Sequence, residues 1–266
     1  MVRDLLIRGM IAGLIAGLFC FGVAKVFGEP QVDRAIAFEE SHAEAQPPAP
    51  DHGDAATAHD HSASAHEHDH GGEELVSRPV QSTVGLATAT LVYGAAMGGL
   101  FALAFAFLYG RVGDISPRVL ALLLALAAFV AIYYVPSLKY AANPPAVGEP
   151  DTITYRTGLY LLMMLTSLGG MVFSVALGRR LVTRYGGLNA TLIGAGVYVA
   201  IIVIVQLALP DINEMPADFP ASVLWKFRMA SLGMQAVTWG VLGVVFGALA
   251  DRLLHPAFAP RAQRTA

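Results

Sequence analysis

The stretch Leu5–Phe27 reads LLIRGMIAGLIAGLFCFGVAKVF, an apolar run that follows a basic N-terminal segment. It is long enough to cross the ~30 Å hydrocarbon core of a bilayer as a helix. Gly9, Gly13 and Gly17 recur every four residues, which places them on one helix face suited to close packing against another helix. A cleaved signal peptide would have a shorter apolar run and a small-residue cleavage site. We therefore predict a retained transmembrane helix.

The rest of the chain is also rich in long apolar runs. Of its 266 residues, 55% are hydrophobic and only 14% are charged, a composition typical of membrane proteins. Five further apolar runs meet the length criterion for a spanning helix, namely Val84–Tyr109, Val119–Val135, Gly158–Gly178, Ala190–Leu209 and Met229–Ala250. We predict an all-α integral membrane protein with about six transmembrane helices. Five spans are the alternative, if the short run Val119–Val135 packs as a re-entrant segment.

A weak internal repeat links the even-numbered runs. Gly98-x-x-Phe101, Gly170-x-x-Phe173 and Gly243-x-x-Phe246 each fall within one of them. Transporter folds are often built from such repeats. Three repeated helix hairpins related by duplication are therefore a further expectation, although G-x-x-F is a common pattern in apolar sequence.

The charges predict how the chain is oriented. With six spans, both termini and the short turns at Gly110–Arg118 and Arg179–Asn189 share one side, which holds ten arginines and only three acidic residues. The opposite side holds the remaining seven basic and 17 acidic residues. Arginine in short loops marks the cytoplasmic face. We predict a multi-pass protein of a bacterial inner membrane with both termini in the cytoplasm.

The first outer loop is unusually rich in histidine. Its segment His52–His70 reads HGDAATAHDHSASAHEHDH and holds six of the eight histidines. Neutral imidazoles are the ligands that Co, Ni, Zn and Cu prefer, and such biased tracts are typical of labile metal binding. A polar loop that only keeps the protein soluble is the alternative. The predicted metal ligands are His52, His59, His61, His66, His68 and His70.

The chain thus divides into four segments: a first transmembrane helix (1–27), a His-rich periplasmic loop (28–83), a five-helix membrane bundle (84–254) and a cytoplasmic tail (255–266). The loop is too polar to bury a core, so we expect it to be mostly disordered without metal.

Two further outer loops, Val135–Gly158 and Leu209–Ser231, are rich in proline and in Asx or Glx residues. Proline fixes the backbone there. One interpretation makes them rigid caps whose aromatic residues contact membrane lipid and whose polar residues pair with Arg156 and Arg228. The other makes them the mouth of a cation path. On that interpretation the oxygen ligands are Asn143, Glu149, Asn213 and Glu214.

Several classes of function lack support in the sequence. The lysines belong to no phosphate-binding loop, Cys20 is the single cysteine, and no basic tract suggests nucleic acid. No catalytic constellation is visible, so we predict neither an enzyme nor a tightly bound cofactor. No ionisable residue lies near the centre of the later spans, where proton-coupled carriers usually need one.

Several segments in order resemble the CbtA family, predicted cobalt transporter subunits of bacteria. They are GEP (Gly28–Pro30), the histidine-rich loop, VPSLKYAANPPAVGEPDTITYRT (Val135–Thr157), GGLNA (Gly186–Ala190) and LPDINEMPADFPASVLWKFRMASLGMQ (Leu209–Gln235). The resemblance covers nearly the whole chain. It implies cobalt import for cobalamin synthesis, together with a small one-helix partner, CbtB, that carries its own histidine motif.

Residues and resemblance together predict a membrane subunit of a divalent transition-metal uptake transporter, with Co(II) as the captured and transported ion. The residues alone indicate only a divalent transition metal. A membrane scaffold that senses or stores metal and docks a partner without transport is the alternative, because capture and transport use the same ligands.

Overall fold

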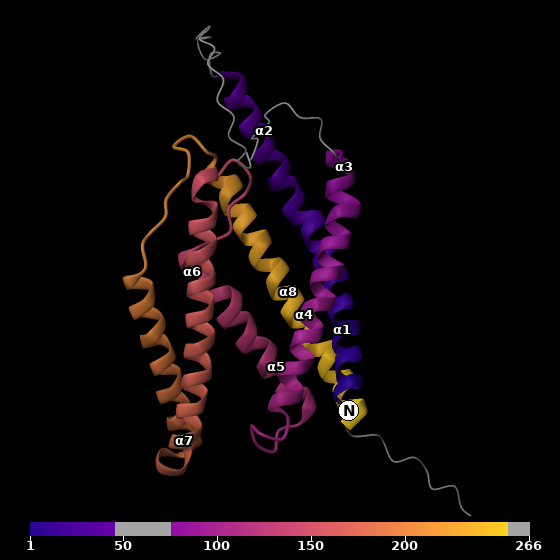
Figure 1. Ribbon diagram of the computed structural model, residues 1–266, viewed down its shortest axis with the longest axis vertical. Coiled ribbons are helices and arrows are strands. Elements are labelled where there is room, and N and C mark those ends of the chain that lie inside the picture. Colours follow the sequence, from indigo (N-terminus) through magenta and orange to yellow (C-terminus); the bar gives the residue numbers. More distant parts are fainter. Residues whose placement is uncertain (46–75, 255–266) are drawn as a thin grey trace, which may run out of the picture.

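The computed structural model describes residues 1–45 and 76–254, and in these ranges every regular element is a helix (Figure 1). Five of the helices are long and apolar enough to cross a membrane, which makes the chain an all-helical membrane protein. The elements in order are α1 (Val2–Val23), η1 (Ala24–Gly28), α2 (Glu29–Ala45), α3 (Arg78–Val80), η2 (Gln81–Gly85), α4 (Leu86–Leu108), α5 (Pro117–Ala128), η3 (Phe129–Tyr134), α6 (Val135–Lys139), η4 (Pro150–Thr152), α7 (Ile153–Ala208) and α8 (Ala221–Leu254).

The first helix runs far beyond its apolar part. α1 passes through the π-helical turn η1 directly into α2, which ends at Ala45. The expectation of a polar loop over residues 28–83 is therefore wrong for residues 78–83, which are helical, and for residues 29–45. The physical reason is local: this segment is rich in Ala and Glu, which favour helix. The widened turn before Pro30 accommodates a ring that would otherwise clash with the preceding helical turn.

The predicted glycine face of α1 packs against α4. A methyl group added at Gly13 would overlap the carbonyl oxygen of Gly94, and one added at Gly9 would overlap that of Gly98. The two backbones therefore touch with no side chain between them, which is the arrangement that small residues permit in membrane helices. This prediction is confirmed, and the partner helix is now identified.

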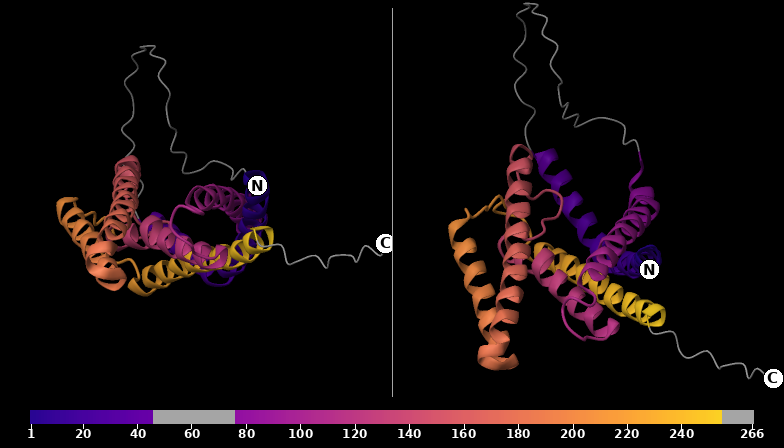
Figure 2. Two further views of the ribbon diagram at one scale, coloured as in Figure 1. Left: turned by 90° about the horizontal axis from the view of Figure 1, so that it is seen from below. Right: turned by 60° about the horizontal axis from the view of Figure 1, so that its bottom comes forward.

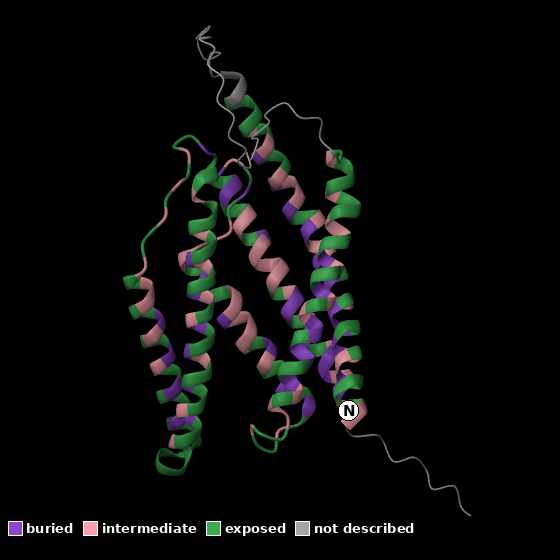
Figure 3. Ribbon diagram, in the orientation of Figure 1, coloured by how far each residue is buried: buried purple, intermediate pink, exposed green. Residues whose placement is uncertain are grey.

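Helices α5 and α8 complete a bundle around this pair. The core of the bundle contains an aromatic cluster in which Phe246 of α8 meets Phe101 and Phe105 of α4 edge to face, at ring-centroid distances of 5.3 and 5.0 Å. Such tilted pairs are favoured by the aromatic quadrupole. Buried residues concentrate in this bundle, whereas much of the α7 surface is exposed (Figure 3).

Helix α7 folds back on itself. Gly186 has a φ of 75° and a ψ of 165°, which lie outside the helical region. Glycine adopts these angles at little cost because it has no Cβ. The arms on either side, residues 153–185 and 187–208, run antiparallel as a hairpin that stands beside the bundle (Figure 2). The buried hydroxyls of Ser167 and Tyr198 join the arms with an oxygen–oxygen distance of 2.8 Å.

The three G-x-x-F segments occupy different surroundings. Gly98 packs on α1, Gly243 packs on Ala125 of α5, and Gly170 packs on the other arm of α7. Phe101 and Phe246 are buried together, whereas Phe173 is 57% exposed. The three expected hairpins therefore do not pair as equivalent units.

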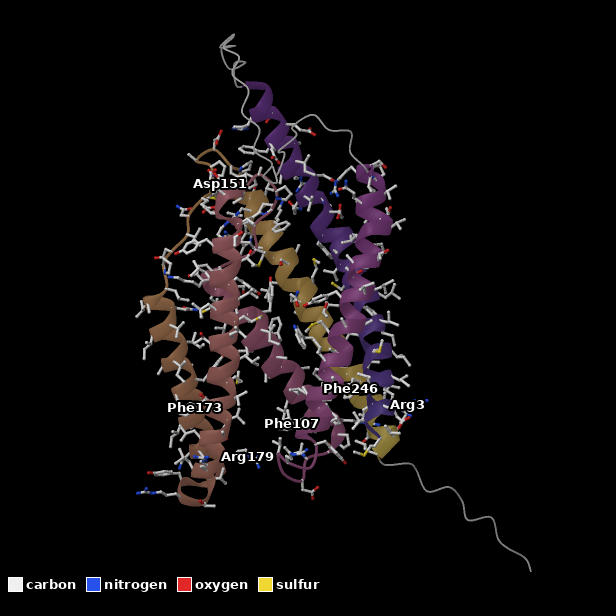
Figure 4. All side chains as sticks on the ribbon, in the orientation of Figure 1. Arg3, Phe107, Asp151, Phe173, Arg179 and Phe246 are labelled. Carbon is white, nitrogen blue, oxygen red and sulfur yellow. The ribbon has the colours of Figure 1, made fainter. Side chains whose placement is uncertain are left out.

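The helix ends form two opposite faces of the molecule. The start of α1, the turn between α4 and α5, the bend of α7 and the end of α8 lie at one end (Figure 1). Arg3 and Arg179 mark that end, and Asp151 marks the other, where the two proline-rich loops lie (Figure 4). We call the end that carries Asp151 the loop face.

Candidate functional site

The two proline-rich loops meet at the loop face, over the beginning of α7 and beside α8. A cavity of about 850 Å³ lies between them. Its walls come from the end of α6, both loops, the first turns of α7 and α8. The lining residues are Leu138, Lys139, Tyr140, Ala141, Asn143, Pro144, Pro145, Val147, Ile153, Arg156, Thr157, Tyr160, Ile212, Asn213 and Arg228.

Glu214 connects the two loops. Its Oε2 accepts hydrogen bonds from the backbone N–H of Glu149 and from the Thr152 hydroxyl, each at 2.9 Å. The Nε of Arg156 lies 3.3 Å from the same oxygen. These contacts, with the Glu149 N–H foremost, hold the pKa of the Glu214 carboxyl below its ordinary value. The group is therefore an anion whose Oε2 already accepts two hydrogen bonds and lies beside one guanidinium.

Asn143 is held in a similar way by α8. Its Oδ1 accepts a hydrogen bond from Arg228 Nη2 at 2.9 Å, while Arg228 Nε donates to the carbonyl of Ala142 at 3.3 Å. A second tie between the loops joins the Lys139 ammonium to Asp211 and the Tyr140 hydroxyl to the Pro210 carbonyl. The loop face is thus cross-linked by polar contacts.

The four expected mouth residues fall into two pairs. Glu214 and Asn143 pair with Arg156 and Arg228, as the alternative interpretation anticipates. Glu149 and Asn213 are exposed. Within residues 1–45 and 76–254 neither of these two side chains has a hydrogen-bond partner. The structure brings the backbone of Glu149 to Glu214 and places both asparagines in the cavity wall.

The six histidines of the predicted capture loop lie outside the described residues. Among the residues that are described, no group of three or more His, Cys, Asp or Glu side chains is arranged to hold a metal ion. The described part of the chain therefore offers single carboxylates and amides near the cavity, and no assembled metal centre.

One contact at the loop face has no counterpart in the sequence analysis. His42, near the end of α2, pairs through Nε2 with the Asp218 carboxylate. Phe38, one turn earlier, packs edge to face on Phe219 at a centroid distance of 5.0 Å. The hydrogen bond that His42 donates to the Asp218 carboxylate raises the pKa of His42 above its ordinary value, and the same bond lowers the pKa of Asp218.

Helix α2 is therefore docked on the second proline-rich loop by an apolar contact and a polar one. The i,i+4 spacing of Phe38 and His42 is a weak signal for a common helix face. Nothing in the sequence indicates a partner 176 positions away. The consequence is that the chain enters the histidine-rich segment from a point beside the cavity loops.

Comparison with known proteins identifies the family of this chain. The model of a family described as probable cobalt transporter subunit (CbtA) matches residues 2–251. No curated protein matches the chain, and neither does any solved structure.

Proposed function

Because the chain belongs to the CbtA family, we propose that it is the membrane subunit of an uptake transporter for a divalent transition metal, with cobalt as the cargo. The observation that carries this proposal is the family match over nearly the whole chain. The five long apolar helices agree with it, since an ion can cross a bilayer only through protein that satisfies its charge.

Capture of the ion belongs, in this proposal, to His52, His59, His61, His66, His68 and His70. Several imidazoles on a short segment can share one borderline divalent ion. The docking of α2 beside the proline-rich loops supports a role for this segment at the same face as the cavity.

The mouth of the ion path is proposed at Glu149, Glu214, Asn143 and Asn213. Arg156 and Arg228 face the cavity, so a bare cation is repelled from its interior. The carboxylates of Glu149 and Glu214 are not among the residues that line it. We therefore place first contact with the metal at this acidic rim and assign Asn143 and Glu214 an additional role in holding the loops.

The proposed topology has six crossings, because each arm of α7 reaches the roughly 20 residues that a spanning helix needs. The loop face is then periplasmic and both termini are cytoplasmic, as the arginine distribution favours. A cysteine at Ala63 in a Cys20→Ser background should react with an impermeant thiol reagent outside spheroplasts. A cysteine at Gly187 should react only after the membrane is opened, and labelling of both from outside contradicts the proposal.

Uptake of radioactive cobalt into vesicles tests the function itself. We expect accumulation in vesicles that contain the chain with a small one-helix subunit resembling CbtB, and little in vesicles without the chain. Metal that binds to the vesicles but never becomes resistant to an external chelator would instead support a metal-sensing or metal-storing scaffold.

A further inference from the structure

The cavity at the loop face has an unusual charge for a metal-transport protein. Three of its lining residues, Lys139, Arg156 and Arg228, are cationic. Among the described residues that form its wall, none is acidic. Three like charges around one space repel each other and attract a negative group, most strongly where the surroundings are poorly hydrated.

The neighbouring carboxylates offset this charge only in part. Asp211 pairs with Lys139 from an exposed position, with 91% of its side chain in solvent, and Glu214 pairs with Arg156. Among the described residues, the hydrogen-bond acceptors of Arg228 are neutral, namely the Ala142 carbonyl and the Asn143 amide oxygen. The cavity wall therefore retains a net positive charge that is centred on Arg228.

Free hydrogen-bond donors accompany that charge. A guanidinium carries five N–H groups, and the hydrogen bonds of Arg228 to the described residues use Nε and one Nη2 hydrogen. Asn143 accepts from Arg228 through its oxygen, which leaves its amide N–H groups for another partner. Gly148 has a φ of 111° and lies against the guanidinium of Arg156, so a methyl group added at this glycine would overlap that guanidinium. The donors are thus held in place by the backbone around them.

We propose that this cavity binds an anionic phosphate group through Arg228 and Arg156. The planar fork of a guanidinium matches the oxygens of a phosphate, and a volume of about 850 Å³ is in the range of organic ligand sites. The ligand is a phospholipid headgroup or a soluble phosphate monoester. The exposed aromatic residues Tyr155 and Trp225 lie near the start of α7 and α8. Tyrosine and tryptophan at the ends of membrane helices sit at the level of the lipid headgroups.

Binding to the purified full-length chain tests this proposal, independently of metal transport. Native mass spectrometry measures the affinity for phosphatidylglycerol and for zwitterionic phosphatidylcholine, and thermal unfolding measures protection by glycerol phosphate. We expect phosphatidylglycerol or glycerol phosphate to bind, and phosphatidylcholine to bind weakly. Protection by glycerol phosphate identifies a soluble ligand, and binding of phosphatidylglycerol alone identifies a headgroup.

Matched variants locate the site. Arg228→Gln should weaken anion binding by about tenfold or more, because it removes a charge-assisted pair. Lys226→Gln removes the same charge from an exposed position of the same helix outside the cavity and should bind like the parent. Arg228→Lys keeps the charge and loses the fork, so its affinity should be intermediate.

Loss of loop structure is distinguished by Thr152→Val, which removes a hydroxyl that ties Glu214 to the first loop and leaves all three cations in place. It should retain anion binding. Equal binding of both lipids, or unchanged binding in Arg228→Gln, overturns the proposal. Equal loss in Lys226→Gln and Arg228→Gln also overturns it, because the attraction would then be non-specific.

Discussion

The crossing of α1 and α4 and the loop face of the same molecule are held together in opposite ways. At the crossing, the Gly9, Gly13 and Gly17 face touches the α4 backbone, so the fit depends on the absence of side chains. At the loop face, the long side chains of Arg156 and Arg228 tie two proline-rich loops together with hydrogen bonds and ion pairs.

The two regions therefore differ in role: the crossing stabilises the fold, and the loop face carries groups that can bind ions. A glycine crossing gains close van der Waals contact along two helices and offers no group that could bind an ion. The loop face has the carboxylates, amides and guanidiniums, and it lies where water can reach them. Changes at the crossing should therefore act on folding, and changes at the loop face should act on the handling of ions.

The largest effect is expected at the crossing. Gly13→Ala places a methyl group into the carbonyl of Gly94, and neither backbone can move without separating the helices. We expect a loss of stability of about 1–3 kcal/mol or more from overpacking. Thermal unfolding in detergent measures it. Gly22→Ala on the same helix has open space around the new methyl group and should unfold like the parent; equal losses would contradict the packing described.

At Glu214 we expect a smaller effect on folding than at the crossing, and a larger effect on transport. Glu214→Gln keeps the shape and removes the charge at the proposed rim, so the uptake rate per folded molecule should fall severalfold even at high metal. Asp151→Asn removes an exposed carboxylate from the same face of the molecule and serves as the control.

If Glu214 serves only to hold Arg156 and the two loops, the outcome differs. Glu214→Gln would then unfold at lower temperature, and the surviving protein would transport at the parent rate. That result would end the assignment of Glu214 to the ion path while leaving the loop geometry intact.

The smallest effect is expected where α2 docks through His42. Because the folded protein raises the pKa of His42, the pairing stabilises docking fully below the ordinary value of 6.5 and is lost as pH rises through the raised pKa. The lowered pKa of Asp218 sets the lower limit of the pairing. The pairing is fully present above pH 3.8 and is lost as the pH falls through the pKa of folded Asp218, which lies below 3.8. The protection factors of the α2 amides in hydrogen exchange, which correct for the intrinsic pH dependence of the rate, should therefore fall above neutral pH.

The variant Asp218→Asn provides the control for α2 docking. It lacks the carboxylate that binds the imidazolium, so its α2 amides should have lower protection factors at pH 6, and these should change little as the pH rises. An unchanged pH profile in Asp218→Asn would show that another group controls the docking.

The sequence predicts the membrane helices and the glycine face because both depend on local patterns. Apolar length and four-residue spacing are properties of one helix, and they identify α1 and its packing surface correctly. The helical extension to Ala45 is missed because its composition is polar, and polar composition alone does not distinguish a solvated helix from a loop. The pairing of α5 with α8 is missed because contacts between spans leave little trace in apolar sequence.

At the candidate site, sequence reasoning identifies the loops and their arginines but not the pairing. Arg156 and Arg228 stand out by their position before a helix, and the alternative pairing interpretation names them. The contact between His42 and Asp218 depends on where α2 points in space, which no local pattern encodes. The positive cavity is missed for the same reason, since Lys139, Arg156 and Arg228 come from three separate segments.

We propose that the histidine-rich segment captures the ion and that the membrane bundle transports it. Cobalt uptake by a variant with His59, His61, His66, His68 and His70 replaced by Ala tests it most directly. We expect a severalfold loss at scarce metal and full recovery at saturating metal. Capture by the parent should weaken below about pH 6, where imidazoles protonate. A loss that persists at saturating metal would contradict separate roles for the two parts, because the histidines would then belong to the path itself.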